Sequence, residues 1–139
     1  MAHEIKLDTK LDVVAVHFTG EVSWEEIAAV MDECVRLPGF HKGLKAIGDF
    51  RKCEVSIGPV EMNKLVAYAK RHDLEWGDTR WALIAEKDYI YGLARMFIAK
   101  TNEMNVESRV FRTDSDADDW LGIGVSPDEA LSQIFAPNV

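Results

Sequence analysis

The sequence predicts an α/β fold, in which helices alternate with the strands of a mixed sheet of about five strands. Three observations lead to this prediction: a hairpin opens the chain, single helices link the later strands, and the run over residues 81–85 is apolar on both faces. Because a helical crossover returns the chain in the same direction, the strands after the hairpin should be parallel. The predicted order is ββαβαβαβα plus a C-terminal helix.

The opening hairpin is predicted to consist of strands at residues 4–8 and 11–22, with a turn at residues 8–10. Val14 and Val16 fall on the same face of the second strand, since the side chains of a strand alternate with period two. The hairpin therefore supplies the antiparallel edge of the sheet.

Two helices have clear start signals. Ser23 is expected to cap a helix that runs to about Leu37, because its hydroxyl can accept a backbone N–H and Glu26 completes a capping box. A second helix should begin at Pro59, whose missing N–H costs nothing in the first turn, and run to about His72.

The remaining elements alternate in the same way. A buried strand is predicted at Leu44–Phe50 and is followed by a loop at residues 51–58. The other predicted elements are, in chain order, a strand at Thr79–Glu86, a helix at 89–102 capped by Asp88, a strand at Val106–Phe111, a short helix capped by Asp114 or Ser115, and a final helix at 127–135.

The length of 139 residues predicts a single domain over residues 1–139. Within it, residues 123–139 are predicted to form a C-terminal helical extension. Its apolar side chains, Leu131, Ile134 and Phe135, either cover the core or pack on a second copy of the chain. In the second case the protein is a homodimer.

The charge balance excludes some partners. With 16 basic and 24 acidic residues the net charge is −8, whereas nucleic acid binding relies on cations that neutralise phosphates. No apolar run approaches the roughly 20 residues that span a bilayer, and the charged N-terminus does not resemble a signal peptide. We therefore expect no nucleic acid partner, no membrane insertion and a cytoplasmic location. Cys34 and Cys53 form no CxxC pair and no disulfide framework is expected, which fits a reducing compartment.

Motifs for catalysis and cofactor binding are missing from the sequence. The chain has no GxGxxG after a strand, no phosphate-binding loop, no GxSxG nucleophile elbow and no HExxH. The histidines are spread over different predicted elements, so no set of metal ligands is apparent. We therefore expect no enzymatic activity, no cofactor and no metal.

The candidate site is the crevice at the carboxyl ends of the parallel strands, where open sheets usually bind ligands or partners. Asp49 lies at the end of the third predicted strand, Arg51 and Ser56 follow it, and Lys87 and Tyr89 follow the fourth. The alternative is that Asp49 and Arg51 pair locally and that Ser56 merely caps the next helix.

Six short segments carry a family resemblance. In chain order they are Gly20-Glu-Val-Ser, Leu37-Pro-Gly-Phe, Gly48-Asp-Phe-Arg, Trp81-Ala-Leu-Ile-Ala, Gly92-Leu-Ala-Arg-Met-Phe, and Val110-Phe-Arg-Thr with Ala117 and Trp120-Leu121. Together they resemble the SpoIIAA-like proteins, small bacterial proteins grouped with the STAS domains and, more distantly, with the CRAL-TRIO lipid-binding domains. The resemblance covers about residues 4–122 and implies the mixed sheet predicted above.

The resemblance also implies a regulatory role without catalysis. STAS proteins bind partner proteins, and their founding member is controlled by serine phosphorylation at the start of the helix after the third strand. The switch motif Asp-Ser-Ser-Gly is absent from this chain, and the corresponding stretch offers Ser56 with Gly58 behind it. Phosphorylation of Ser56 is therefore a hypothesis, supported by the favourable position of a phosphate near a helix N-terminus.

Two functions are consistent with the sequence. The leading one is a regulatory or partner-binding domain that uses the loop after Asp49 and the adjacent helix face. The alternative is a domain that binds a small apolar or lipid-like ligand in a cavity lined by aromatic and methionine side chains, namely Trp24, Met62, Trp76, Trp81 and Met96. Such residues at helical spacing more often belong to the core.

Overall fold

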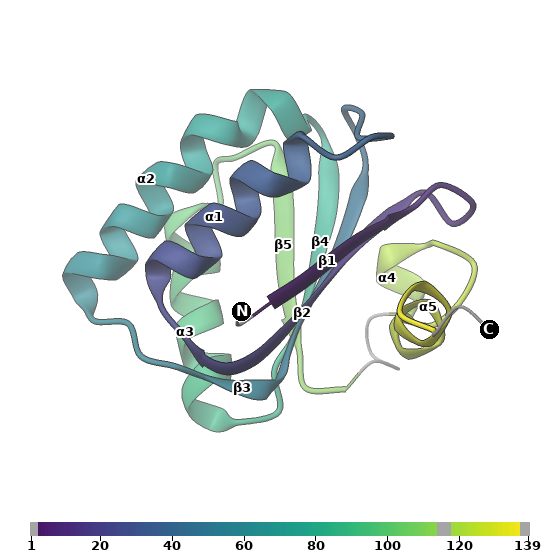
Figure 1. Cartoon of the computed structure of the whole chain (residues 1–139). Coiled ribbons are helices and arrows are strands. Elements are labelled where there is room, and N and C mark those ends of the chain that lie inside the picture. The colour runs from purple at the N-terminus through teal and green to yellow at the C-terminus, as the bar shows by residue number, and fades with distance from the viewer. Residues whose placement is uncertain (1–2, 114–117, 137–139) are drawn as a thin grey trace.

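Five strands form one mixed sheet in the computed structural model, which describes residues 3–113 and 118–136 (Figure 1). The strands are β1 (His3–Asp8), β2 (Val13–Val22), β3 (Lys45–Val55), β4 (Thr79–Ile84) and β5 (Val106–Phe111). They lie side by side in sequence order, and β1 pairs antiparallel with β2 while the later neighbours pair in parallel. The predicted fold class and the opening hairpin are confirmed.

The helices of the described residues are α1 (Trp24–Val35), α2 (Pro59–Trp76), α3 (Asp88–Lys100), α4 (Asp118–Leu121) and α5 (Pro127–Ile134). Figure 1 shows α1, α2 and α3 on one face of the sheet and α4 and α5 on the other. Connections between neighbouring parallel strands are nearly always right-handed, so strands in sequence order place every crossover helix on the same face. The last two helices cover the face that the crossovers leave bare. None of these helices has the length and apolar character needed to cross a membrane.

Two helices begin where the sequence predicts. Ser23 precedes α1, and its Oγ accepts a hydrogen bond from the Glu26 backbone N–H at 3.2 Å. α2 begins at Pro59, with Gly58 as the N-cap residue. The Gly58 N–H donates to Oε1 of Glu61 at 2.8 Å, so a glutamate side chain satisfies the backbone group at this helix start.

The second crossover helix is longer than the sequence predicts. The predicted end is about His72, whereas α2 continues to Trp76 and stops at Gly77, whose φ of 68° favours glycine. The extra turn buries the Trp76 ring, which packs edge-on against Phe40 and Trp81. Burial of this large aromatic side chain explains the extension.

The third strand is also longer, which corrects the predicted loop at residues 51–58. β3 extends to Val55 instead of ending at Phe50. Its extension pairs with residues 19–22 of β2, and the register shifts just after His17 because β3 carries an extra residue there. Such a β-bulge bends the strand and redirects its side chains. The predicted end was wrong because β2 reaches far enough to pair with four more residues, 52–55.

Two apolar clusters fill the two sides of the sheet. The larger one lies under α1, α2 and α3, and the smaller one lies under α4 and α5. In the smaller cluster Leu131 and Ile134 of α5 pack with Val13 of β2. The apolar side chains of the C-terminal helix therefore cover the sheet of their own chain. The predicted caps of the short helix, Asp114 and Ser115, lie outside the described residues.

Candidate functional site

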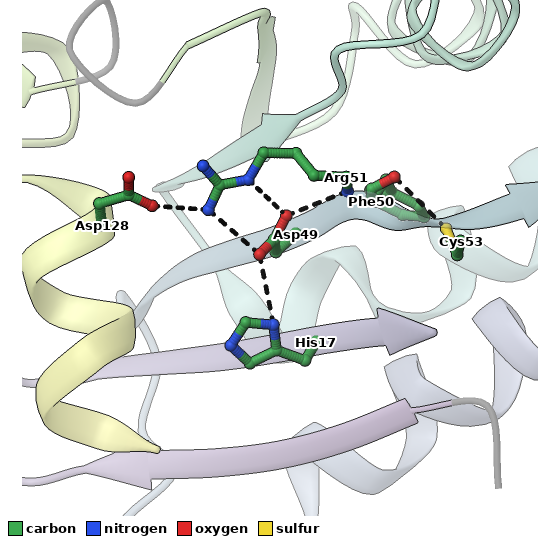
Figure 2. Close-up of polar contacts among 6 residues, drawn as sticks. All are labelled: His17, Asp49, Phe50, Arg51, Cys53 and Asp128. Carbon is green, nitrogen blue, oxygen red and sulfur yellow. Dashed lines mark hydrogen bonds and ion pairs between the residues drawn. The ribbon is translucent and has the colours of Figure 1, made fainter. Parts of the chain in front are cut away.

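The predicted site residues fall into two groups. Asp49 and Arg51 lie within β3, on the face that α5 covers, and not in a loop at the strand's end (Figure 2). Arg51 Nε donates to Asp49 Oδ1 at 2.9 Å, and Arg51 Nη2 donates to Asp49 Oδ2 at 3.2 Å. The Asp49 side chain is 3% exposed. This is the local pairing that the sequence left open as the alternative.

Two more side chains join this pair, and we call the four residues His17, Asp49, Arg51 and Asp128 the Arg51 cluster. Asp128, in the first turn of α5, accepts a hydrogen bond from Arg51 Nη2 at 2.6 Å. His17 Nδ1 of β2 lies 3.2 Å from Asp49 Oδ2, and its ring packs edge-on against Phe135. Hydrogen bonds to Asp49 and then to Asp128 raise the pKa of Arg51 above its usual value. The cluster therefore ties α5 to β2 and β3.

The second group lies around the end of β3. Lys87 is the N-cap residue of α3, and its Nζ donates to the carbonyl oxygen of Cys53 at 3.0 Å and pairs with Glu54. Ser56 is exposed and is not the cap of α2. Tyr89, in the first turn of α3, is 58% exposed. The structure thus divides the five predicted residues into a pair under α5 and three exposed side chains near the end of β3.

A cavity of about 90 Å³ lies between the sheet and helices α1, α2 and α3. Its wall includes Ala46 and Gly48 of β3 and Ala94 of α3. Because these side chains are small, they leave space that larger residues would fill. Sequence reasoning missed the position of this cavity, and the signal that could have indicated it is the set of small residues at interior positions of facing elements.

The aromatic and methionine residues predicted for an apolar site are only partly brought together. Met62 and Trp81 line the cavity of about 90 Å³. Trp76 lines a smaller neighbouring cavity of about 20 Å³, which also has Trp81 on its wall. Trp24 and Met96 line neither of the two, and Met96 is 45% exposed on the outer side of α3. The structure brings neither of those two residues to the walls of these two cavities.

The wall of the larger cavity is almost wholly apolar. None of the described residues that line it carries a charge. Burial, with a smaller effect of Glu33, raises the pKa of the Cys34 thiol on this wall to about 12, so the thiol stays protonated at neutral pH. Trp81 Nε1 is buried and has no hydrogen-bond partner among the described residues. In the same described ranges, no three His, Cys, Asp or Glu side chains form a group that could hold a metal ion.

Comparison with known proteins bears on the fold. No family model matches the chain, and no curated protein sequence matches it. Among solved structures, an uncharacterized protein from the DUF3478 family with a SpoIIAA-like fold, from Shewanella loihica PV-4, is similar to this chain with a TM-score of 0.54. The two chains are 17% identical, and the match covers 86% of this chain and 94% of that chain. The likeness shows that this chain has a SpoIIAA-like fold, as the resemblance predicts.

Proposed function

We propose that this protein binds a small apolar molecule, without catalysis, in the cavity between the sheet and helices α1, α2 and α3. The observation that carries the proposal is the cavity itself, about 90 Å³ in volume with an uncharged wall. Protein interiors are packed like organic crystals and contain few voids larger than a water molecule. A protonated Cys34 thiol on the wall supports binding without nucleophilic chemistry.

The size of the cavity limits the ligand. One water molecule needs roughly 10–15 Å³, and an engineered cavity of roughly 150 Å³ holds benzene. A cavity of about 90 Å³ lies between these volumes, which favours a small ring or a short chain. A ligand that fills the space adds apolar contacts that the unfilled cavity lacks.

The geometry gives less support to the regulatory or partner-binding role, which is the leading prediction from the sequence. Its predicted surface includes Asp49 and Arg51, which bond to one another and are held under α5. Ser56, Lys87 and Tyr89 stay exposed near the end of β3. A regulatory partner at that end, and phosphorylation of Ser56, stay predictions.

Native mass spectrometry of the freshly purified protein is the first test. We expect a species heavier than the polypeptide by the mass of one small organic molecule, which is released when the protein is denatured. Bare protein in the native spectrum, together with a failure of the titration described next, would overturn the proposal.

Benzene is the probe for a titration followed by ¹H–¹⁵N NMR, because it needs no polar partner. Ala94 lines the cavity from α3, whereas Ala99 of the same helix is exposed. Ala94→Leu adds side-chain volume to the cavity and should weaken benzene binding roughly tenfold or more, while Ala99→Leu leaves it unchanged. Equal binding by the two variants would mean that benzene binds elsewhere, which contradicts the proposal.

A further inference from the structure

Trp81, on the cavity wall, has a buried indole N–H that finds no partner in the described part of the chain. Trp81 Nε1 is enclosed and has no acceptor among the described residues. Buried tryptophan N–H groups usually find an acceptor, because a hydrogen bond left unmade in the interior costs free energy. Trp81 lines both the cavity of about 90 Å³ and the smaller one of about 20 Å³, so a molecule bound beside the ring is the candidate source of the missing acceptor.

The Trp81 ring is held by its neighbours. Trp81 lies in β4, paired in register with Ala46 of β3 and Ser108 of β5. Trp76 packs edge-on against the ring, with the ring centroids 4.8 Å apart and the ring planes at 76°. A donor on a ring fixed in this way loses little conformational entropy when an acceptor binds.

Building on the proposed function, we propose that Trp81 Nε1 is the donor that selects the ligand, and that the ligand is a small neutral molecule with one acceptor oxygen. Ketones, aldehydes, ethers and small esters have this chemistry. A carboxylate does not fit, because none of the described residues on the wall carries a positive charge and an unpaired buried ion is costly. A pure hydrocarbon fills the space but leaves the N–H unpaired.

A water molecule is the competing partner for this N–H. The smaller cavity of about 20 Å³ also has Trp81 on its wall, together with His72 and Ser108, and it is large enough for one water. If a water there accepts from the indole, the N–H is satisfied in the absence of a ligand. The two possibilities predict different responses to a ligand with an acceptor.

Cyclopentanone and methylenecyclopentane separate them, because the two molecules have nearly the same shape and differ in carrying C=O or C=CH₂. Each is titrated into the ¹⁵N-labelled full chain, and the indole N–H resonances are followed by NMR. Trp81→Phe identifies the resonance that belongs to Trp81. We expect this resonance to move downfield with the ketone and to move far less with the alkene.

Binding affinities supply a second measurement. On Trp81→Phe the ketone should lose about twofold to tenfold more affinity than the alkene, which is the range for one net hydrogen bond. The alkene corrects for the change in cavity shape. Trp120→Phe is the matched control, because Trp120 packs against Phe111 on the opposite face of the sheet and its substitution should change neither affinity.

Two outcomes would overturn the donor role. They differ in whether the proposed ligand-binding function also fails. If neither probe binds and benzene does not bind either, the proposed function fails and the donor role fails with it. If both probes bind and the Trp81 resonance responds to them equally, the cavity binds ligands but Trp81 does not select them. Where Trp81→Phe does not fold, the Trp81 resonance is assigned from through-bond and through-space correlations in the wild-type protein, which has four tryptophans, and the wild-type spectra then decide this second case.

Discussion

The two faces of the sheet are covered in different ways. Under α4 and α5 the strand side chains are sealed, with 0% exposure at Val13, Ala15, Ile47, Ala82 and Ile84. Under α1, α2 and α3 a cavity of about 90 Å³ remains, although these helices are longer. The same strands supply both faces, so the cavity is not the result of a generally loose sheet.

On the sealed face, charged side chains of the strands contact both covering helices, α4 and α5. Arg51 of β3 binds Asp128 of α5. The guanidinium groups of Arg80 and Arg109 lie 5.4 and 5.3 Å from the ring centre of Trp120 in α4. Cation–π and ion-pair contacts of this kind fix short helices that have little apolar area of their own.

On the other face, two polar contacts join the start of α3 to β3 and to Arg112. Lys87 donates to the Cys53 carbonyl, and Arg112 Nη1 donates to Oδ1 of Asp88 at 2.6 Å. The middle of the helix, with Ala94, stands over the cavity. This fold can therefore fix a helix at one end and leave space beneath its middle.

The largest expected effect comes from opening the Arg51 cluster. Arg51→Ala leaves the buried Asp49 carboxylate without its cation, and we expect the free energy of unfolding to fall by about 3–5 kcal/mol. Asp128→Asn removes a partner that is 48% exposed and should cost about 1 kcal/mol or less. Urea denaturation measures both variants.

Arg95→Ala is the control for these two variants, because Arg95 is exposed on α3 and its loss should change stability by no more than about 0.5 kcal/mol. A loss for Arg51→Ala as small as that for Arg95→Ala would show that charge does not hold α5. The contrast between the faces would then rest on apolar packing alone.

A matched pair of leucines tests the packing itself. Leu131 of α5 and Leu65 of α2 are each 4% exposed, but Leu65 lines the cavity. A side chain beside a void has fewer contacts to lose. We therefore expect Leu131→Ala to cost about 4 kcal/mol and Leu65→Ala about 2 kcal/mol in urea denaturation. Equal losses would mean that the cavity wall is as well packed as the sealed face.

The smallest expected effect is a loss of stability in alkali that belongs to the thiols under α1–α3. Burial raises the pKa of Cys34 to about 12 and that of Cys53 to about 11, from an ordinary 9.0. Above pH 9 the unfolded chain releases thiol protons that the folded protein retains, so the free energy of unfolding falls as the pH rises. At pH 10 Cys34 should account for about 1 kcal/mol of that fall.

Cys34→Ala isolates this contribution when urea midpoints are compared at pH 8 and pH 10. The variant should lose the Cys34 part of the pH dependence and keep the parts that belong to Cys53 and to Tyr68, whose hydrogen bond to Asp32 also raises its pKa. If the variant and the wild type have the same pH dependence, Cys34 ionises normally in the folded protein. Water would then reach the cavity wall, and the wall would be less apolar than described.

Local signals account for the parts of the fold that could be predicted. The cap at Ser23 and the start at Pro59 depend on residues within one helical turn, and the alternation of β2 depends on its own sequence. The end of β3 could not be predicted in this way, because it depends on how far β2 extends beside it. Tertiary pairing, and not strand propensity, fixes that boundary.

In the candidate site, too, the local contact could be predicted from the sequence and the long-range contacts could not. The Asp49–Arg51 pair was foreseeable as a local contact, whereas Asp128 joins it from 77 residues further along the chain. The cavity is still harder to predict. It exists because Gly48 of β3 and Ala94 of α3, two small residues, line the same space and do not fill it. The sequence contains these small residues but does not say which of them face one another.

Strand order has a consequence for how the folded protein behaves at high concentration. Because the strands lie in sequence order, β1 and β5 are the two edges of the sheet, with backbone groups open to a further strand. Charged side chains guard both edges, with Glu4 and Lys6 exposed on β1 and Glu107 and Arg109 exposed on β5. Charged edges resist edge-to-edge pairing, so the native sheet is protected against β-aggregation. Aggregation is then a risk in partly unfolded chains, in which helices no longer cover the apolar strand β4.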